Sequence, residues 1–255
     1  MDQQEYSKNR INYPSLILGT GFLILWQAAA VIIDRSHILP GPLQILLRTW
    51  ELRESLLFHH MPSTLLTILC GWMISVTVGI FLAVMMHENR YIEAALHHVL
   101  IITQTIPVMC ISPLFVLWLG YTMGARLIAV VLSTFFAITL SVYDGLQNTD
   151  PMKKELMRTY GAGGLQIFWR LEVPSALPGL FTALKMTIPW AVIDAAVAEW
   201  LGATRGLGYF SKRMITKMDG AAVFAPLLIL SIIALAGMGL IRLVEKRLAS
   251  YRSEL

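Results

Sequence analysis

The chain has 255 residues, of which 56% are hydrophobic and 14% charged, and its mean hydropathy is +0.64. An ordinary globular domain has about 25% charged residues, so this composition leaves too little polar surface to cover a water-soluble body of this size. The formal net charge is +4, but no segment clusters basic residues with exposed aromatic ones, which argues against a nucleic-acid-binding protein.

Six apolar stretches are long enough to cross about 30 Å of hydrocarbon as α-helices. Their apolar residues run continuously rather than alternating with polar ones, which favours helices over the strands of a membrane barrel. We therefore predict an all-α integral membrane protein that forms a single transmembrane domain over residues 1–255. The six predicted spans lie near residues 14–33, 62–86, 94–119, 123–146, 176–201 and 221–244.

The first stretch has the basic flank and the small residues of a secretory signal peptide, since Lys8 and Arg10 precede it and residues 28–30 are alanine. Its apolar length of about 20 residues is that of a full span, whereas the apolar region of a signal peptide is shorter. We expect a retained first helix. The connection that follows mixes apolar residues such as Leu43 and Trp50 with basic ones, which predicts an interfacial helix.

The basic residues indicate the orientation of the chain. An even number of spans places both termini on the same side of the membrane. Eleven basic residues, Lys8 and Arg10 among them, fall in segments that are cytoplasmic when both termini are inside, against eight in the outer segments. Because cytoplasmic segments are enriched in Lys and Arg, we predict a multi-pass protein with both termini in the cytoplasm.

The predicted cytoplasmic connection between the fourth and fifth spans, residues 150–174, is the most informative segment. Asp150 is a good N-cap for a short helix that should reach about Tyr160, and the glycines that follow it stop the helix and allow a sharp turn. Residues 165–171 can form a second short helix that Pro174 ends. The pattern predicts a helix, a glycine turn and a second helix at the membrane surface.

The faces of this connection are too apolar for a solvated loop, because Leu156, Met157 and Tyr160 are followed by Phe168 and Trp169. Outside the bilayer, an apolar patch rimmed with charge usually marks a protein contact. The alternative is that the patch folds back against its own helix ends or against the lipid headgroups.

The same connection resembles the EAA loop of ABC importer permeases, in which a Glu is followed by a Gly and then by an aliphatic-x-aliphatic-Pro motif. Leu156 and Met157 stand where that pattern has two alanines. In that family the loop docks into a groove of a cytoplasmic ATPase. The resemblance therefore implies that the ATPase-coupling residues here are Glu155, Leu156, Met157, Tyr160, Gly161, Leu171, Val173 and Pro174.

Further short motifs are similar to the nitrate, sulfonate and taurine branch of these permeases. They comprise Leu39 and Pro40, Pro107, Pro113, Trp118 to Gly120, Glu199 and the run from Gly206 to Tyr209. The resemblance implies a type I ABC importer permease fold in a bacterial cytoplasmic (inner) membrane. It also implies a permease homodimer, ATPase subunits that bind ATP and Mg²⁺, and an external solute-binding protein.

Three ionisable residues lie inside the fifth predicted span, where each is a functional candidate because burying charge in lipid is costly. Lys185 can extend toward the interface or pair with a neighbouring helix. Asp194 either faces a water-filled path or hydrogen-bonds to another helix, and Glu199 either joins that path or is an interfacial carboxylate. The residues assigned to a translocation path are Asp194, Glu199, Trp190 and Pro107, since a proline that kinks a helix suits a cavity wall.

The sequence has no phosphate-binding loop and no nucleophile–base or metal constellation within its spans, so we expect no catalytic residue, metal or cofactor in this chain. The permease hypothesis competes with a secondary transporter or channel that works without an ATPase, and with an intramembrane enzyme. The branch resemblance implies a sulfonate, taurine or nitrate as solute. The carboxylates Asp194 and Glu199 instead favour a neutral or cationic solute such as a pyrimidine precursor of thiamine.

Overall fold

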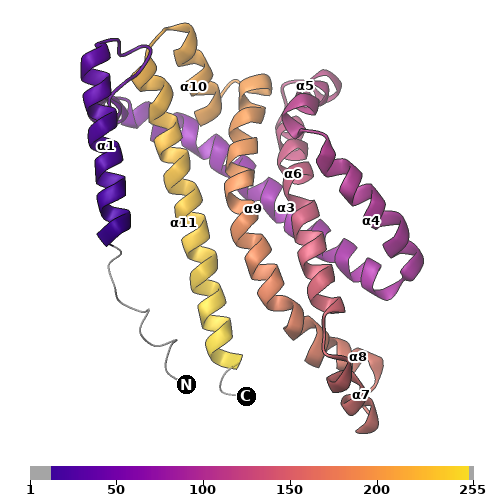
Figure 1. The fold of residues 1–255 in the computed structure, drawn as a ribbon. Helices are drawn as coiled ribbons and strands as arrows, with labels where there is room; N and C mark the ends of the chain where they lie inside the picture. The colour runs from indigo at the N-terminus through magenta and orange to yellow at the C-terminus, as the bar shows by residue number, and fades with distance from the viewer. Residues whose placement is uncertain (1–12, 253–255) are drawn as a thin grey trace.

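The computed structural model describes residues 13–252 as a succession of helices (Figure 1). Lys8 and Arg10, which entered the prediction of orientation, lie outside the described residues. In the first half of the chain the helices are α1 (Tyr13–Ile33), α2 (Pro42–Glu51), the π-helical η1 (Ser55–His60), α3 (Met61–Glu88), α4 (Arg90–Thr105) and α5 (Val108–Leu119). The second half contains α6 (Met123–Gln147), α7 (Pro151–Thr159), α8 (Gly164–Ile167), the π-helical η2 (Phe168–Glu172), α9 (Val173–Gly202), α10 (Leu207–Thr216) and α11 (Gly220–Arg252).

Five helical segments of the described chain are long and apolar enough to cross a membrane, and each overlaps one of the predicted spans. They cover Leu16–Ile33, Ser55–Glu88, Met123–Gln147, Gly164–Gly202 and Gly220–Leu248. Two of them are longer than predicted because π-helical turns join surface helices to spans: η1 continues into α3, and η2 connects α8 to α9. The all-α membrane architecture is thereby confirmed.

The third predicted span, residues 94–119, is divided into two helices, α4 and α5, whose axes are bent by 95°. The break lies at Ile106 and Pro107, and Ile106 has an extended backbone at φ −96° and ψ 117°. A proline disfavours the helical conformation of the residue before it and supplies no backbone N–H. One continuous helix over 94–119 is therefore wrong, and six spans result only if the bent pair counts as one.

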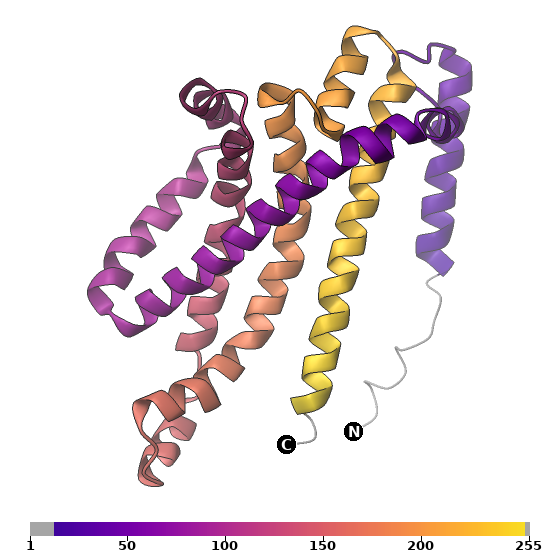
Figure 2. The same ribbon diagram turned by 180° about the vertical axis from the view of Figure 1, so that it is seen from behind.

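The centre of the bundle consists of α3, α6 and α9. Figure 2 shows α3 crossing α6, α9 and α11 obliquely, while α1 lies at the margin of the molecule. Small residues allow α6 and α9 to approach closely: a Cβ atom added to Gly145 would lie 2.7 Å from Ala176 Cα, and one added to Gly179 would lie 2.8 Å from the Ser141 carbonyl oxygen. Close backbone contact through small residues is how membrane helices gain packing energy.

The exposed surface of the bundle is apolar. In α1 the side chains of Leu18 and Ile32 are exposed, and Leu117 in α5 is exposed as well. Buried side chains such as Val130 and Ile138 lie on the inner side of α6, against α3. This arrangement suits a protein whose solvent at mid-depth is lipid, because large apolar side chains then need no protein cover.

The two ends of the bundle carry different elements. Helices α7 and α8 extend beyond the ends of α6 and α9 on the same side as the end of α11, whereas α10 lies at the opposite end (Figure 1). Helix α2 lies at the end that carries α10, and Arg48 in α2 forms an ion pair with Asp219 at 2.7 Å. The exposed Leu43 and Trp50 of α2 fit the predicted interfacial helix.

Candidate functional site

The connection between α6 and α9 forms a helical elbow, which we define as residues 150–172. Asp150 caps α7, since its Oδ1 accepts a hydrogen bond from the Met152 amide at 2.9 Å. Helix α7 ends at Thr159, and the turn places Gly161 at φ +80°, a conformation that glycine adopts without steric cost. The predicted helix and glycine turn are both present.

The second half of the elbow differs from the prediction. Residues 165–171 do not form a separate helix ended by Pro174, because the backbone stays helical from Gly164 to Gly202. Pro174 lies in the first turn of α9, within this continuous helical segment, and has no backbone N–H to donate to the preceding turn. The turn before it widens to a π-helix, and the Val173 amide bonds to the Phe168 carbonyl. The elbow is therefore directly continuous with the membrane-spanning helix α9.

Large apolar side chains project from the elbow. Tyr160 is 83% exposed and Trp169 61% exposed, and Leu156 and Leu165 are exposed as well. We call Leu156, Tyr160, Leu165 and Trp169 the elbow surface. These four side chains do not fold back onto the bundle, whereas Ile167 does and is buried. Exposed apolar patches of this kind are typical of surfaces that contact another protein or a membrane.

The other residues implied by the family resemblance are distributed around this surface. Glu155 and Gly161 are exposed, and Met157 is half-buried. Leu171, Val173 and Pro174 are half-buried where the elbow joins α9. Their assignment to ATPase coupling remains a prediction.

Lys185 forms an ion pair with a neighbouring helix, which is one of the two possibilities that the sequence left open. Its Nζ lies 2.8 and 3.0 Å from the two carboxylate oxygens of Glu245 on α11. Both side chains are about 30% exposed, so the protein buries this ion pair only in part. It links the lower halves of α9 and α11.

Trp190 lies on the outward face of α9, and Asp194 lies beside that face. Trp190 is 40% exposed and Ile193 56% exposed, and both belong to a stripe that reaches Trp200. Asp194 lies half-buried beside this stripe, with Ser133 of α6 as its polar neighbour. Pro107, the fourth predicted path residue, is exposed at the break between α4 and α5.

Glu199 has no exposed surface and is held by a polar network. Its Oε2 accepts hydrogen bonds from Thr64 Oγ1 at 3.1 Å and from the Gly208 amide at 2.9 Å. Arg126 lies close on the other side, with Nη1 3.9 Å from Glu199 Oε1. The carboxylate therefore links α3, α6, α9 and α10. Because it is fully buried, no part of it is accessible to a solute in this chain. The sequence identified Glu199 as an ionisable residue within a span, but it did not identify these partners.

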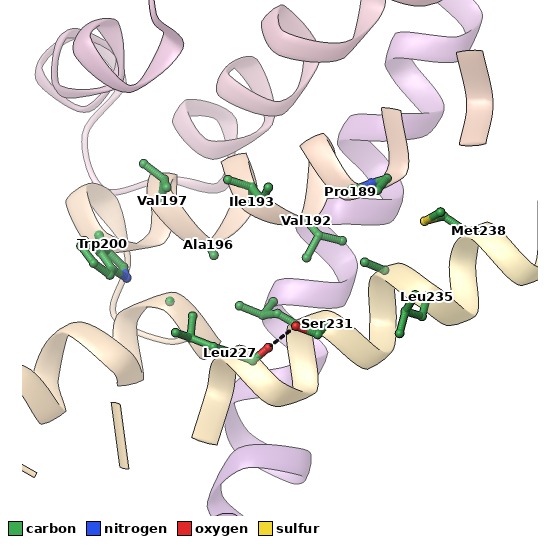
Figure 3. A pocket seen from close by; sticks show the side chains of 13 residues that line it. Pro189, Val192, Ile193, Ala196, Val197, Trp200, Leu227, Ser231, Leu235 and Met238 are labelled. Atoms are coloured by element: carbon green, nitrogen blue, oxygen red, sulfur yellow. Dashed lines mark hydrogen bonds between the residues drawn. The ribbon is translucent and has the colours of Figure 1, made fainter. Parts of the chain in front are cut away.

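The groove between α9, α10 and α11 encloses about 540 Å³ (Figure 3). Pro189, Ile193 and Trp200 line it from α9, and Leu227 and Ser231 line it from α11. Ser231 already donates a hydrogen bond to the Leu227 carbonyl at 2.9 Å, so the groove offers a polar solute almost nothing. Of the four predicted path residues, none lines it.

A second pocket, of about 550 Å³, opens at the end of the bundle that carries α10. It is far more polar, and we call it the outer pocket. Its lining residues are Phe58, His59, Pro62, Ser63, Leu66, Tyr121, Arg126, Thr204 and Arg205. Arg126 Nη1 donates to Ser63 Oγ at 3.2 Å, which holds the guanidinium in place. Aromatic rings beside fixed hydrogen-bond donors suit a small polar solute with a planar ring.

The part of the chain that the structure describes contains no group of three or more His, Cys, Asp or Glu side chains arranged to hold a metal ion. One histidine of each adjacent pair has a backbone partner. His60 Nδ1 accepts a hydrogen bond from the Gly206 amide at 3.2 Å, and His98 Nδ1 lies 2.9 Å from the Ala94 carbonyl oxygen.

The chain was compared with known proteins. A family model described as "binding-protein-dependent transport system inner membrane component" matches residues 75–250. The formylaminopyrimidine transport permease protein ThiX of Halalkalibacterium halodurans is 45% identical over 232 residues, which cover 91% of this chain and 93% of the relative. The putative aliphatic sulfonates transport permease protein SsuC of Bacillus subtilis is 24% identical over 240 residues, which cover 93% and 87%.

Solved structures agree on the fold. A chain from the crystal structure of an amino acid ABC transporter with histidines has a TM-score of 0.62 at 18% identity, covering 73% of this chain and 91% of that one. A chain from the MetNI methionine ABC transporter in an inward-facing conformation has a TM-score of 0.57 at 21% identity, covering 71% and 93%. The family match over most of the chain and the shared helical fold show that this protein belongs to the binding-protein-dependent inner-membrane components, the permeases of ABC importers.

Proposed function

We propose that the elbow of this permease docks into a separate cytoplasmic ATPase and that two copies of the chain enclose the path of a small solute. The observation that carries this proposal is the exposed elbow surface, whose second half, from Gly164 onward, is helically continuous with α9. A tilt imposed on the elbow is therefore transmitted to the helix that carries Trp190 and Asp194. ATP and Mg²⁺ bind to the partner subunit, and an external solute-binding protein delivers the solute.

The proposed orientation places the elbow and both termini in the cytoplasm of a bacterium, with the outer pocket facing outward. The fold supports this, because the elbow lies at the same end of the bundle as the end of α11 (Figure 1). Lys153, Lys154 and Arg158 in α7 lie at that end, as the enrichment of basic residues on the cytoplasmic side requires.

For the solute we propose a small pyrimidine related to the precursors of thiamine. The relative that is 45% identical is named a formylaminopyrimidine permease, and this identity extends over nearly the whole chain. The outer pocket supports the assignment, since Phe58 and Tyr121 offer rings for stacking and Arg126 offers donors for a carbonyl oxygen. The sequence suggested that Asp194 and Glu199 form an acidic path, which would favour a neutral or cationic solute. This argument is weaker in the structure, because Glu199 is buried in its hydrogen-bond network and only Asp194 lies near the surface.

The translocation path is proposed to follow the outward stripe of α9, with Trp190 and Asp194 facing the second copy of the chain. Pro107 contributes by turning α4 away from α5. Glu199 is assigned a role in holding the outer ends of α3, α9 and α10 together instead of a place in the path.

The test is transport by the purified chain in sealed vesicles, with and without the ATPase and the binding protein. We expect ATP-dependent uptake of radiolabelled formylaminopyrimidine that requires both partners, and weaker uptake of taurine, aliphatic sulfonates or nitrate. Uptake by the chain alone would identify a secondary transporter or channel and would contradict the proposal. Preferred uptake of a sulfonate would retain the permease and reject the pyrimidine.

A further inference from the structure

Glu172 lies at the junction of the elbow with α9 and is buried, with its side chain 11% exposed. It is the variable position between Leu171 and Val173 in the aliphatic-x-aliphatic-Pro motif, so its neighbours in sequence gave no reason to single it out. A buried carboxylate at this depth requires charged or hydrogen-bonding partners, because an isolated one is strongly destabilising.

Both oxygens of Glu172 have such a partner, and the partners come from different elements. Lys154 of α7 places its Nζ 2.7 Å from Oε1, and His87 at the end of α3 places its Nε2 2.9 Å from Oε2. The side chains of Lys154 and His87 are 22% and 11% exposed, so water competes little with these contacts. The Glu172 carboxylate therefore links α7, α3 and the start of α9.

Helix α7 has few other attachments to the bundle. None of its side chains is buried. Within residues 13–252, the contact of Lys154 with Glu172 is the only ion pair that joins α7 to another helix. Apolar packing does not hold α7 at a set angle, so the position of this helix relative to α3 and α9 depends on the ion pair.

We propose that Lys154, Glu172 and His87 form a relay that transmits movement of the elbow to α3 as well as to α9. Glu172 is the positioning residue of this relay. This inference rests on the proposed docking of an ATPase at the elbow surface. When the ATPase displaces α7, the charge-assisted contacts keep Glu172 with Lys154 and draw the end of α3 along through His87. Without these contacts α7 moves but α3 and α9 do not follow, and ATP is hydrolysed without transport.

The experiment measures solute uptake and ATP hydrolysis in the same vesicles containing the full complex, which gives the solute moved per ATP. Glu172→Gln and Lys154→Met should each lower this ratio about tenfold, in the range typical of coupling between two sites, while hydrolysis continues. The double variant should be no worse than Glu172→Gln alone, because Glu172→Gln already removes the carboxylate that Lys154 contacts. Lys153→Met is the matched control, since Lys153 is exposed on the same helix and should leave the ratio unchanged.

A second measurement follows movement directly. Spin labels at positions 88 and 153 report the distance between α3 and α7 in the nucleotide-free and ATP-bound complex. We expect this distance to stay constant in the parent complex and to change on ATP binding in Glu172→Gln.

Different outcomes overturn different statements. An unchanged solute-to-ATP ratio in Glu172→Gln overturns the relay and leaves the permease assignment standing. Loss of the ATPase from complexes of both single variants, with retention in Lys153→Met, also overturns the relay, because the contact would then shape the docking surface instead of transmitting movement. Absence of ATP-dependent uptake in the parent complex overturns the proposed function itself.

Discussion

Thr64 and Glu199 are hydrogen-bonded in the interior of the bundle, with Thr64 Oγ1 donating to Glu199 Oε2 over 3.1 Å. The same hydroxyl accepts a hydrogen bond from the Leu207 amide at 2.8 Å, and Glu199 accepts one from the Gly208 amide. Both side chains are fully buried. One threonine therefore joins α3 to the end of α9 and to the first turn of α10.

Thr64→Val should destabilise the protein. The substitution preserves side-chain shape but removes the acceptor for the Leu207 amide and the donor to Glu199, and each buried unsatisfied group costs about 1–3 kcal/mol. The unfolding midpoint of the purified protein in detergent measures the effect. Thr77→Val is the matched control on α3, because Thr77 is exposed and its hydroxyl bonds only to Met73 of its own helix. Equal midpoints for the two variants would contradict the proposed role of the network.

Gly208→Ala should be more damaging than its single added carbon suggests. A Cβ atom at Gly208 would overlap the backbone of Ala196 in α9, including its carbonyl oxygen, and neither backbone can shift independently. Overpacking of this kind typically costs about 1–3 kcal/mol. The yield of folded protein and its unfolding midpoint should both fall.

Gly239→Ala is the control for that substitution. Gly239 lies in α11 with no atom within 4 Å of an added Cβ, and alanine is favoured over glycine within a helix by about 0.5–1 kcal/mol. Its unfolding midpoint should be unchanged or slightly higher. A similar loss of stability in both glycine variants would show that contact with Ala196 is not the cause.

Lys185→Met should destabilise the bundle by leaving the Glu245 carboxylate without its partner. The effect should lie between the roughly 1 kcal/mol of an exposed ion pair and the about 3–5 kcal/mol of a fully buried one, because both side chains are partly exposed. Adding Glu245→Gln should recover most of the loss. A double variant no more stable than Lys185→Met would mean that Lys185 contributes through packing of its stem and not through charge.

Gly161→Val should abolish solute-stimulated ATP hydrolysis while leaving membrane insertion intact. At φ +80° a β-branched residue is strained, so the turn would open and the elbow surface would lose its arrangement. Gly161→Asn should be tolerated far better, since asparagine adopts this conformation at modest cost. ATPase activity of the assembled complex with and without solute is the measurement.

Gly163→Val separates backbone strain from bulk in that experiment. Gly163 is exposed with open space around it, and its φ of −73° suits any residue. We expect normal stimulation by solute. Normal coupling in Gly161→Val would count against the docking of the elbow, and loss of coupling in Gly163→Val would indicate a steric requirement across the whole turn.

Local chemistry made the elbow predictable. An aspartate cap before a proline, a short run of helix formers and a glycine turn determine structure within a few residues, and the structure shows α7 and its turn where they were expected. The prediction that the second helix ends at Pro174 was wrong, because a proline is compatible with two positions relative to a helix. A proline stops a preceding helix or occupies the first turn of the next, and the π-helical turn η2 made the second role available.

The sequence alone determined that this protein is a bundle of membrane-spanning helices with an apolar elbow at the end of the fourth span, because hydropathy, length and turn chemistry act over short stretches of chain. Only the tertiary structure decided the partners of its charges. Glu199 meets Thr64 and Arg126, Lys185 meets Glu245, and Glu172 meets Lys154 and His87. These partners are 60 or more residues apart, except for Lys154 and Glu172, and their approach depends on how whole helices cross, which no local pattern encodes.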